Sequence, residues 1–176
     1  MPPTPTNAPS SITSLTSSTL LAITVETITI DADTPTIKSY SLEIDDGAGG
    51  EIVPINGGFS DSLSTAFSYN NVVKGRVYRV RYRIRNDIGW SVYSPMGYLR
   101  AADVPSAPPA VIAVTTSATE IALALQPSAD SGGSEITAYE LWIDDGDLGE
   151  TFTKLDSYDG LSQSFTIELA VETSLV

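Results

Sequence analysis

The feature that most constrains the fold of this chain is that its sequence repeats. Residues 34–51, TPTIKSYSLEIDDGAGGE, align without a gap to residues 133–150, GSEITAYELWIDDGDLGE, and nine positions are identical at a constant offset of 99. Residues 18–26 align in the same way to residues 118–126 at an offset of 100. A repeat of this kind indicates two copies of one structural unit of about one hundred residues. With 176 residues, the chain is expected to hold one complete unit and part of a second.

Both copies alternate apolar and polar residues over short runs. The alternating apolar residues are Leu21, Ile23 and Val25, then Tyr40, Leu42 and Ile44, and in the second copy Ile121, Leu123 and Leu125, then Tyr139, Leu141 and Ile143. A period of two is typical of a strand with one buried face. Clusters of Asp, Gly, Pro and Ser, which are typical of turns, separate the runs. The pattern predicts an all-β chain of antiparallel sandwiches.

The composition excludes several kinds of function. The chain contains no cysteine and no histidine, which excludes disulfides, Ser-His or Cys-His catalysis and zinc sites built from these residues. Catalysis by paired carboxylates needs an enclosing cleft, which the loop tips of a sandwich do not offer. We therefore expect no enzymatic activity and no cofactor. No apolar run approaches the roughly 20 residues of a membrane span, and no signal peptide is visible at the start of the sequence.

Charge is distributed unevenly along the chain. Residues 1–102 hold eight basic and nine acidic residues, whereas residues 103–176 hold one basic and thirteen acidic residues. Nucleic acid and anionic membranes are therefore not expected as partners of the second copy. Five of the nine basic residues of the chain lie within residues 76–85.

These arginines follow the strand period. Tyr78, Val80, Tyr82 and Ile84 alternate with Arg79, Arg81, Arg83 and Arg85, so one face of the strand is apolar and the other carries four arginines. Trp90 and Tyr93 follow in the next predicted strand, and guanidinium groups stack readily on such rings. The preferred interpretation is a sheet face shielded by these aromatic residues and by acids of neighbouring strands. The alternative is an interaction face for sulfated glycans or other polyanions.

These features together resemble the fibronectin type III module, an immunoglobulin-like β-sandwich. The resemblance rests on the Pro-rich beginnings APSS and SAPPA, the strand-B runs, the strand-C runs and NDIGWSVYS at 86–94, which is similar to the family's joint between strands F and G. It implies two tandem antiparallel β-sandwiches, with residues 1–7 as a linker and residues 8–102 as module 1. Residues 103–176 form module 2, which is incomplete at its C-terminal end because it reaches only strands A to E.

The resemblance also implies structural roles. Tyr78 stands where the family has its tyrosine corner, whose hydroxyl pins the turn before strand F. We expect Tyr40 and Tyr139 in the packed interiors, and Pro105 at the junction of the modules, which it would stiffen because proline fixes φ. The sequence departs from the family at Val25 and Leu125, where a core tryptophan is usual, and it has no RGD tripeptide.

The functional expectation follows from this resemblance. It is a non-enzymatic structural or adhesive segment of a longer multi-module protein, extracellular or at the cell surface, that acts as a spacer or fibre-forming subunit. Its partners would be neighbouring modules or copies of the chain, joined through exposed strand edges of module 2. The missing strands would come from the same chain or from another. The uncharged, Ser-, Thr- and Pro-rich residues 1–19 suit a plain linker or an O-glycosylated one.

Two alternatives to this function stay open. One is a specific binding module that uses the Arg79–Arg85 strand face for an acidic protein or glycan. The other is an auxiliary module of a secreted enzyme.

A calcium site is the remaining candidate. Asp144, Asp145, Asp147 and Glu150 bring together the carboxylate oxygens that calcium prefers. An Asp-Gly pair after an alternating strand is also typical of an ordinary hairpin turn. The turn is the preferred interpretation, so no metal site is predicted.

Overall fold

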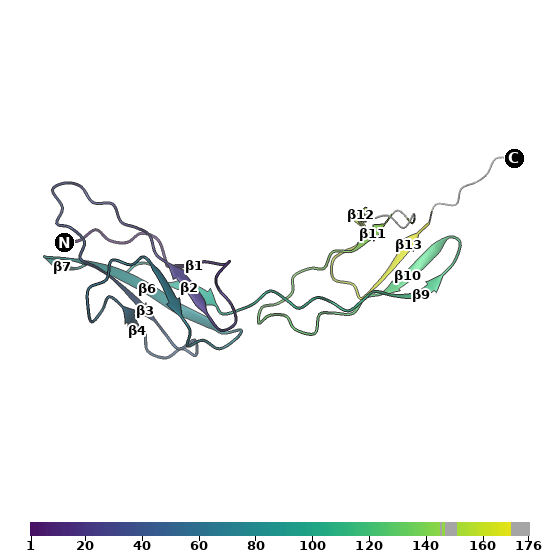
Figure 1. Ribbon diagram of the computed structural model, residues 1–176, viewed down its shortest axis with the longest axis horizontal. Coiled ribbons are helices and arrows are strands. Elements are labelled where there is room, and N and C mark those ends of the chain that lie inside the picture. The colour runs from purple at the N-terminus through teal and green to yellow at the C-terminus, as the bar shows by residue number, and fades with distance from the viewer. Residues whose placement is uncertain (145, 147–150, 170–176) are drawn as a thin grey trace. The chain divides into compact units, whose positions relative to one another are not determined.

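The computed structural model describes residues 1–144, 146 and 151–169. Contacts divide the chain into two compact units, Met1–Val104 with Gly132–Ser134, and Pro105–Ser131 with Glu135–Val176 (Figure 1). Each regular element in the described residues is a β-strand, so the all-β prediction is confirmed. Within the part of the chain that the structure describes, no helix has the length and apolar character required to cross a membrane.

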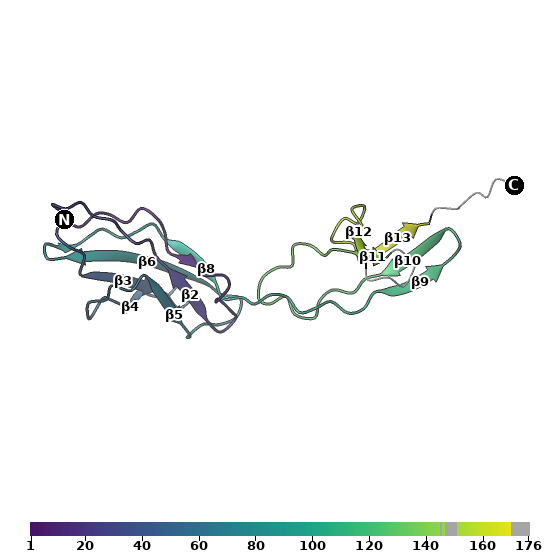
Figure 2. The same ribbon diagram turned by 45° about the horizontal axis from the view of Figure 1, so that its top comes forward.

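Module 1 is built from two antiparallel sheets. The smaller sheet has the order β1 (Ser10–Ser11), β2 (Leu21–Thr24) and β5 (Ala66–Tyr69). The larger sheet has the order β4 (Val53–Asn56), β3 (Ser39–Ile44), β6 (Val77–Asn86) and β7 (Gly89–Trp90), and β8 (Gly97–Arg100), labelled in Figure 2, also pairs with β6. This is the sandwich arrangement that the sequence predicts.

The core of module 1 combines the inward faces of both sheets. Strand β6 alternates buried and half-buried residues along its whole length, as the sequence pattern requires. Its inward side chains Tyr78, Val80, Tyr82 and Ile84 join residues of β2, β3 and β8 in one apolar cluster. Burial of each large aliphatic side chain contributes about 1.5–3 kcal/mol to the hydrophobic stabilisation of this cluster. Strand β6 is thus the central strand of the module.

The N-terminal segment, predicted as a linker over residues 1–7, is partly packed. Pro2 and Pro5 are buried, and Pro5 is among the most completely buried side chains of the described residues. Part of this segment therefore contacts the folded protein.

Beyond β7, serine side chains replace part of the sheet ladder. The main-chain N–H groups of Ser91 and Ser94 donate to the carbonyls of Ile84 and Tyr82 at 2.8 Å each. In return, the Ile84 and Tyr82 N–H groups donate to the hydroxyls of Ser91 and Ser94 at 3.0 and 3.1 Å. Those hydroxyls donate onward to the carbonyls of Val92 and Pro95 at 2.8 and 2.9 Å. We call residues 91–95 the serine-braced edge.

The described residues of module 2 form two small antiparallel sheets. One sheet has the order β13 (Ser164–Glu168), β10 (Glu120–Ala124) and β9 (Ile112–Thr116), and the other pairs β11 (Trp142–Asp144) with β12 (Phe152–Lys154). By the repeat offsets, β13, β10, β11 and β12 correspond to β5, β2, β3 and β4 of module 1, and β9 corresponds to β1 because it pairs with β10 as β1 pairs with β2. Among the described residues, no strand of module 2 corresponds to β6, β7 or β8.

The strand predicted around Tyr139 and Leu141 is shorter than the alternation suggests. The regular ladder begins only at Trp142, where the partner Lys154 of β12 lies opposite. In module 1 the matching residues Ser39–Leu42 pair with β6, and module 2 has no such partner in its described part. Alternating side chains are therefore present without a complete hydrogen-bonded ladder.

Candidate functional site

The outward face of β6 carries the most concentrated set of charged side chains in module 1. We call Arg79, Arg81, Arg83 and Arg85, with Trp90 and Tyr93, the arginine ladder. The ladder follows from the strand period, because the residues between these arginines point into the core. The four arginine side chains are 36%, 30%, 29% and 39% exposed, so each is partly covered.

The aromatic rings cover the guanidinium groups. Arg81 lies 3.8 Å and Arg83 lies 4.8 Å from the centre of the Tyr93 ring. Arg83 and Arg85 lie 4.6 and 5.6 Å from the centre of the Trp90 ring. Each such cation–π contact contributes about 0.5–2 kcal/mol, depending on how far it is desolvated. The structure therefore brings Arg81, Arg83 and Arg85 together with both rings, whereas Arg79 lies on the same face of β6 without a ring contact.

Acids of neighbouring segments neutralise the same arginines. The Arg79 Nε donates to Asp45 at 2.7 Å, and the Arg81 side chain donates to Glu43 at 2.9 Å. Arg85 forms an ion pair with Asp61. Glu43 lies in β3, which pairs directly with β6, and Asp45 follows the last residue of β3. Asp61 lies in the segment between β4 and β5.

Glu43 is the centre of this network. Its side chain is 5% exposed, and its two oxygens receive Arg81, the Tyr93 hydroxyl at 2.8 Å and the more distant Arg83 at 3.7 Å. Burial, and then the hydrogen bond to Glu43, raise the pKa of Tyr93 above its ordinary value. A buried carboxylate that contacts two guanidinium groups and a phenol fixes β3, β6 and residue 93 relative to one another.

The carboxylates of the Asp-Gly turns accept hydrogen bonds from main-chain N–H groups of the same turns. Asp45 accepts from the Gly47 N–H at 3.1 Å, and Asp46 accepts from Ala48 and Gly50 at 2.9 and 3.0 Å. Burial raises the pKa of Asp45, but the hydrogen bonds from Arg79 and Gly47 outweigh this effect and hold the pKa below its ordinary value. These carboxylates are thus committed to the turn and to the ladder.

The calcium candidates of module 2 lie mostly outside the described residues. Asp144 accepts from the Gly146 N–H at 3.2 Å, which matches the turn at Asp45 in module 1. Asp145, Asp147 and Glu150 fall in the residues that the structure does not describe. Across residues 1–144, 146 and 151–169, no group of three or more acidic side chains could hold a metal ion.

Three tyrosines anchor chain segments through their hydroxyls. The Tyr78 hydroxyl accepts from the Val73 N–H at 2.7 Å, in the segment that precedes β6. Tyr40 accepts from Ile28 at 3.0 Å, and Tyr139 accepts from Ser128 at 3.1 Å. The two modules therefore use the repeated tyrosine in the same way. Pro105 is exposed and lies at the start of the second compact unit.

Sequence reasoning did not identify which acids neutralise the ladder. The register places Glu43 opposite Arg81, so a strand alignment of residues 39–44 with 80–85 would have found this pair. Asp61 has no such signal, because its segment has no periodic pattern. The bracing roles of Ser91 and Ser94 were also missed, although both serines belong to the S-x-x-S spacing at the end of the motif NDIGWSVYS.

Comparisons with known proteins give structural likenesses only. Neither a protein-family model nor a curated protein sequence matches the chain. The solved structures that resemble it include titin module A71 from human cardiac muscle, at 21% identity and a TM-score of 0.43 over 55% of this chain and 88% of that one.

Two further solved structures resemble the chain. The sixth fibronectin type III domain of human fibronectin type III domain containing protein 3 has 16% identity and a TM-score of 0.46, over 61% of this chain and 93% of that one. The chicken CNTN1 FN1–FN3 domains have 16% identity and a TM-score of 0.39, over 94% of this chain and 56% of that one. The strand order described above is that of a two-sheet antiparallel β-sandwich, the fold class that the sequence predicts.

Proposed function

We propose that the chain is a non-enzymatic structural segment, a spacer or adhesive pair of β-sandwich modules in a multi-module protein outside the cell or at the cell surface. One observation carries this proposal. The cluster that most resembles a binding site, the arginine ladder, is occupied by the protein's own rings and carboxylates.

The electrostatics of the whole chain point the same way. A polyanion such as a sulfated glycan would need cations that are free to exchange their partners, yet Arg79, Arg81 and Arg85 are each paired with an acid. The net charge of −13 repels polyanions at long range. The ladder therefore serves the sheet, as a clamp between β3, β6 and the segment after β7.

The test separates a clamp from a ligand site. The wild-type chain and an Arg83→Met variant are passed over immobilised heparin at increasing salt, and both are unfolded in urea. We expect neither protein to be retained at physiological salt, and we expect the variant to lose about 1–2 kcal/mol of unfolding free energy with its cation–π contacts. Lys38→Met, which removes the same charge from an exposed pair with Asp87, is the matched control with little effect on stability.

A contrary result would be clear. Salt-sensitive retention of the wild-type chain, lost in a folded and equally stable Arg83→Met variant, would establish the ladder as a ligand-binding face and overturn the structural proposal.

A second candidate function rests on one end of the ladder. Arg85 and Trp90 line a polar hollow of about 390 Å³ together with Gly57, Gly58, Phe59, Ser60 and Asp61. Phe59 is 92% exposed there, and an exposed ring beside an arginine favours contact with an acidic protein or glycan. Retention that is lost in Arg85→Met but kept in Arg83→Met would support this candidate over the purely structural one.

A further inference from the structure

The polar hollow of module 1 lies at one end of the arginine ladder. It has a volume of about 390 Å³, and it is lined by residues 57–61 of the segment after β4 together with Arg85 and Trp90. This volume lies within the range of about 300–1,000 Å³ that is usual for small-molecule sites. All of the lining residues belong to module 1 and to the part of the chain that the structure describes.

Hydrogen bonds at both ends fix the segment that forms one wall of the hollow. The Ser39 hydroxyl of β3 donates to the Gly57 carbonyl at 2.9 Å and accepts from the Ser62 N–H at 3.0 Å. The Tyr40 N–H donates to the Ser62 carbonyl at 2.7 Å. Ser39 is buried, so these bonds are shielded from water. The wall is therefore in place before a ligand arrives, which lowers the entropic cost of binding.

Arg85 and Asp61 give the hollow hydrogen-bonding groups of both kinds. The two side chains form an ion pair and are 39% and 49% exposed. A guanidinium group has five N–H donors, and within the described residues the one side-chain hydrogen bond of Arg85 goes to Asp61. The Arg85 Nε has no hydrogen-bond partner there. The pair can thus donate to a ligand and accept from it without coming apart.

An exposed aromatic ring is the third feature of the hollow. Phe59 is 92% exposed, whereas Trp90 is half-buried and lies 5.6 Å from the Arg85 guanidinium group. The Phe59 ring offers an apolar face to a ligand, and Trp90 holds the guanidinium group in position. The hollow therefore combines an apolar face with a donor and an acceptor.

A sugar ring carries the groups that match this combination. A pyranose presents C–H groups on its face, and each of its hydroxyls both donates and accepts hydrogen bonds. The C–H face can lie on Phe59 while neighbouring hydroxyls accept from Arg85 and donate to Asp61. A few polar groups beside an apolar surface are what fix the orientation of a small ligand.

The charge of the hollow favours a neutral sugar. The guanidinium group of Arg85 and the carboxylate of Asp61 compensate each other, so an acidic ligand would have to displace Asp61 or lie beside its negative charge. The net charge of −13 also repels anions from the chain as a whole. Hydroxyl groups bind without such an exchange.

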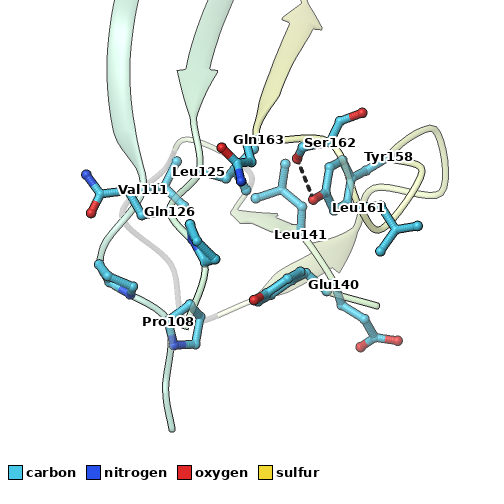
Figure 3. Close-up of a pocket in the computed structure, with 13 residues that line it drawn as sticks. Pro108, Val111, Leu125, Gln126, Glu140, Leu141, Tyr158, Leu161, Ser162 and Gln163 are labelled. Atoms are coloured by element: carbon cyan, nitrogen blue, oxygen red, sulfur yellow. Dashed lines mark hydrogen bonds between the residues drawn. The ribbon is translucent and has the colours of Figure 1, made fainter. Parts of the chain in front are cut away.

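The cavity of module 2 differs in its chemistry. It has a volume of about 100 Å³, and Figure 3 shows Leu125, Leu141 and Tyr158 around the same opening. The Tyr158 hydroxyl donates to the Ser162 carbonyl at 2.8 Å. No basic residue lines this cavity within the described part of the chain. It is therefore smaller and mainly apolar, whereas the hollow of module 1 combines an exposed ring with charges of both signs.

We propose that the hollow of module 1 binds a neutral sugar residue, a pyranose of a glycan. Its C–H face stacks on Phe59, and its hydroxyls bond to Arg85 and Asp61. This inference rests on the second candidate function above, and it narrows the ligand of that site to a neutral glycan.

The probes are the methyl glycosides of glucose, galactose, mannose and N-acetylglucosamine, each added to the full 176-residue chain, isotopically labelled for NMR. The chain has two indole N–H groups, Trp90 in the hollow and Trp142 in module 2 as an internal control. We expect at least one glycoside to shift the Trp90 signal and the amide signals of residues 57–61 saturably, with Trp142 unchanged. The uronic acid that corresponds to this sugar should bind at least about tenfold more weakly.

Two ring deletions locate the binding site. Phe59→Ala should weaken binding of the neutral glycoside about tenfold or more, without loss of fold, because the ring is exposed. Tyr98→Ala removes a ring that is 68% exposed on β8 of the same module and does not line the hollow. This matched control should bind the glycoside as the wild-type chain does.

A third variant tests the preference for a neutral ligand. Asp61→Asn keeps the shape of the side chain and leaves the Arg85 charge without its partner. The uronic acid should then bind at least as well as the neutral glycoside, because the guanidinium group can pair with the carboxylate of the ligand. A preference for the neutral glycoside that persists in Asp61→Asn would contradict the role given to this ion pair.

Three further results would overturn the proposal. They are no shift of Trp90 with any of the four glycosides, equal shifts of Trp90 and Trp142, and equal loss of binding in Phe59→Ala and Tyr98→Ala. None of them affects the clamp between β3 and β6, which is measured by unfolding. Heparin retention that depends on Arg85, with no glycoside bound, would instead assign the hollow to an acidic ligand: the second candidate function would stand and the neutral-sugar inference would be wrong.

Discussion

Among single residues, Glu43 has the most partners in the ladder, since its buried carboxylate contacts Arg81, Arg83 and the Tyr93 hydroxyl. Glu43→Gln keeps the shape of the side chain but leaves two guanidinium groups without their counter-charge. We expect the unfolding free energy of module 1 to fall by about 2–3 kcal/mol, measured by urea unfolding. Glu51→Gln, at an exposed position, is the matched control and should change it by less than about 0.5 kcal/mol. Equal effects of the two changes would show that the network adds nothing to stability.

Tyr82 makes module 1 less stable at alkaline pH. Burial, followed by the nearby Glu26 and Tyr40, raises the pKa of Tyr82 from 10.0 to about 12. The folded state disfavours the ionised phenol, so neutral Tyr82 makes its full contribution to the unfolding free energy below pH 10.0. That contribution is lost as the pH rises through about 12. Absorbance titration should show at least one of the eight tyrosines ionising late, together with unfolding, and Tyr82→Phe should reduce the number of tyrosines that ionise in that late step by one. Ionisation of all tyrosines near pH 10 in the folded protein would contradict this.

The sequence predicts which arginines share one face of the strand, but it does not predict which acids pair with them. Strict alternation alone assigns Arg79–Arg85 to one face, because a strand allows no other placement. The acids depend on which strand lies beside β6 and in which register, and a single sequence does not contain that pairing. Asp61 could not be predicted at all, because it comes from an irregular segment between two strands.

At the scale of the elements, the turn that follows β4 has no room for a side chain at Gly57. Gly57 has φ +68°, and a Cβ there would lie 1.8 Å from the Tyr40 carbonyl oxygen of β3. Gly57→Ala should therefore cost module 1 about 3 kcal/mol or more, measured by thermal unfolding. Gly49→Ala, at φ +88° with nothing within 4 Å of the new methyl group, should cost only about 1 kcal/mol. Similar losses at the two positions would mean that backbone strain alone, and not the close approach to β3, sets the requirement for glycine.

The length of a strand depends on its neighbours as well as on its own residues. Residues 39–44 and 138–143 share the same alternation, but only the first set forms a six-residue strand. The difference follows from β6, whose N–H and C=O groups complete the ladder in module 1. The alternation thus predicts which side chains face inward, while strand ends follow from the available partners.

For the whole molecule, the two modules should unfold separately. Module 1 has a cluster of fully buried residues, whereas the matching residues of module 2 are half-exposed, so module 2 should be the less stable. Each module contains one tryptophan, Trp90 or Trp142, so Trp90→Phe and Trp142→Phe variants report each transition separately in urea. We expect the Trp142 signal to change at the lower concentration. A single transition shared by both probes would show that the modules unfold as one cooperative unit.

The serine-braced edge has a consequence for aggregation. The hydroxyls of Ser91 and Ser94 take the β6 N–H groups and give their own protons to the Val92 and Pro95 carbonyls, so this stretch of the sheet border, beside Tyr82 and Ile84, offers no regular row of donors and acceptors. A strand of another molecule that approaches residues 91–95 therefore finds no continuous ladder to extend. Edge-to-edge aggregation is disfavoured along this stretch of module 1.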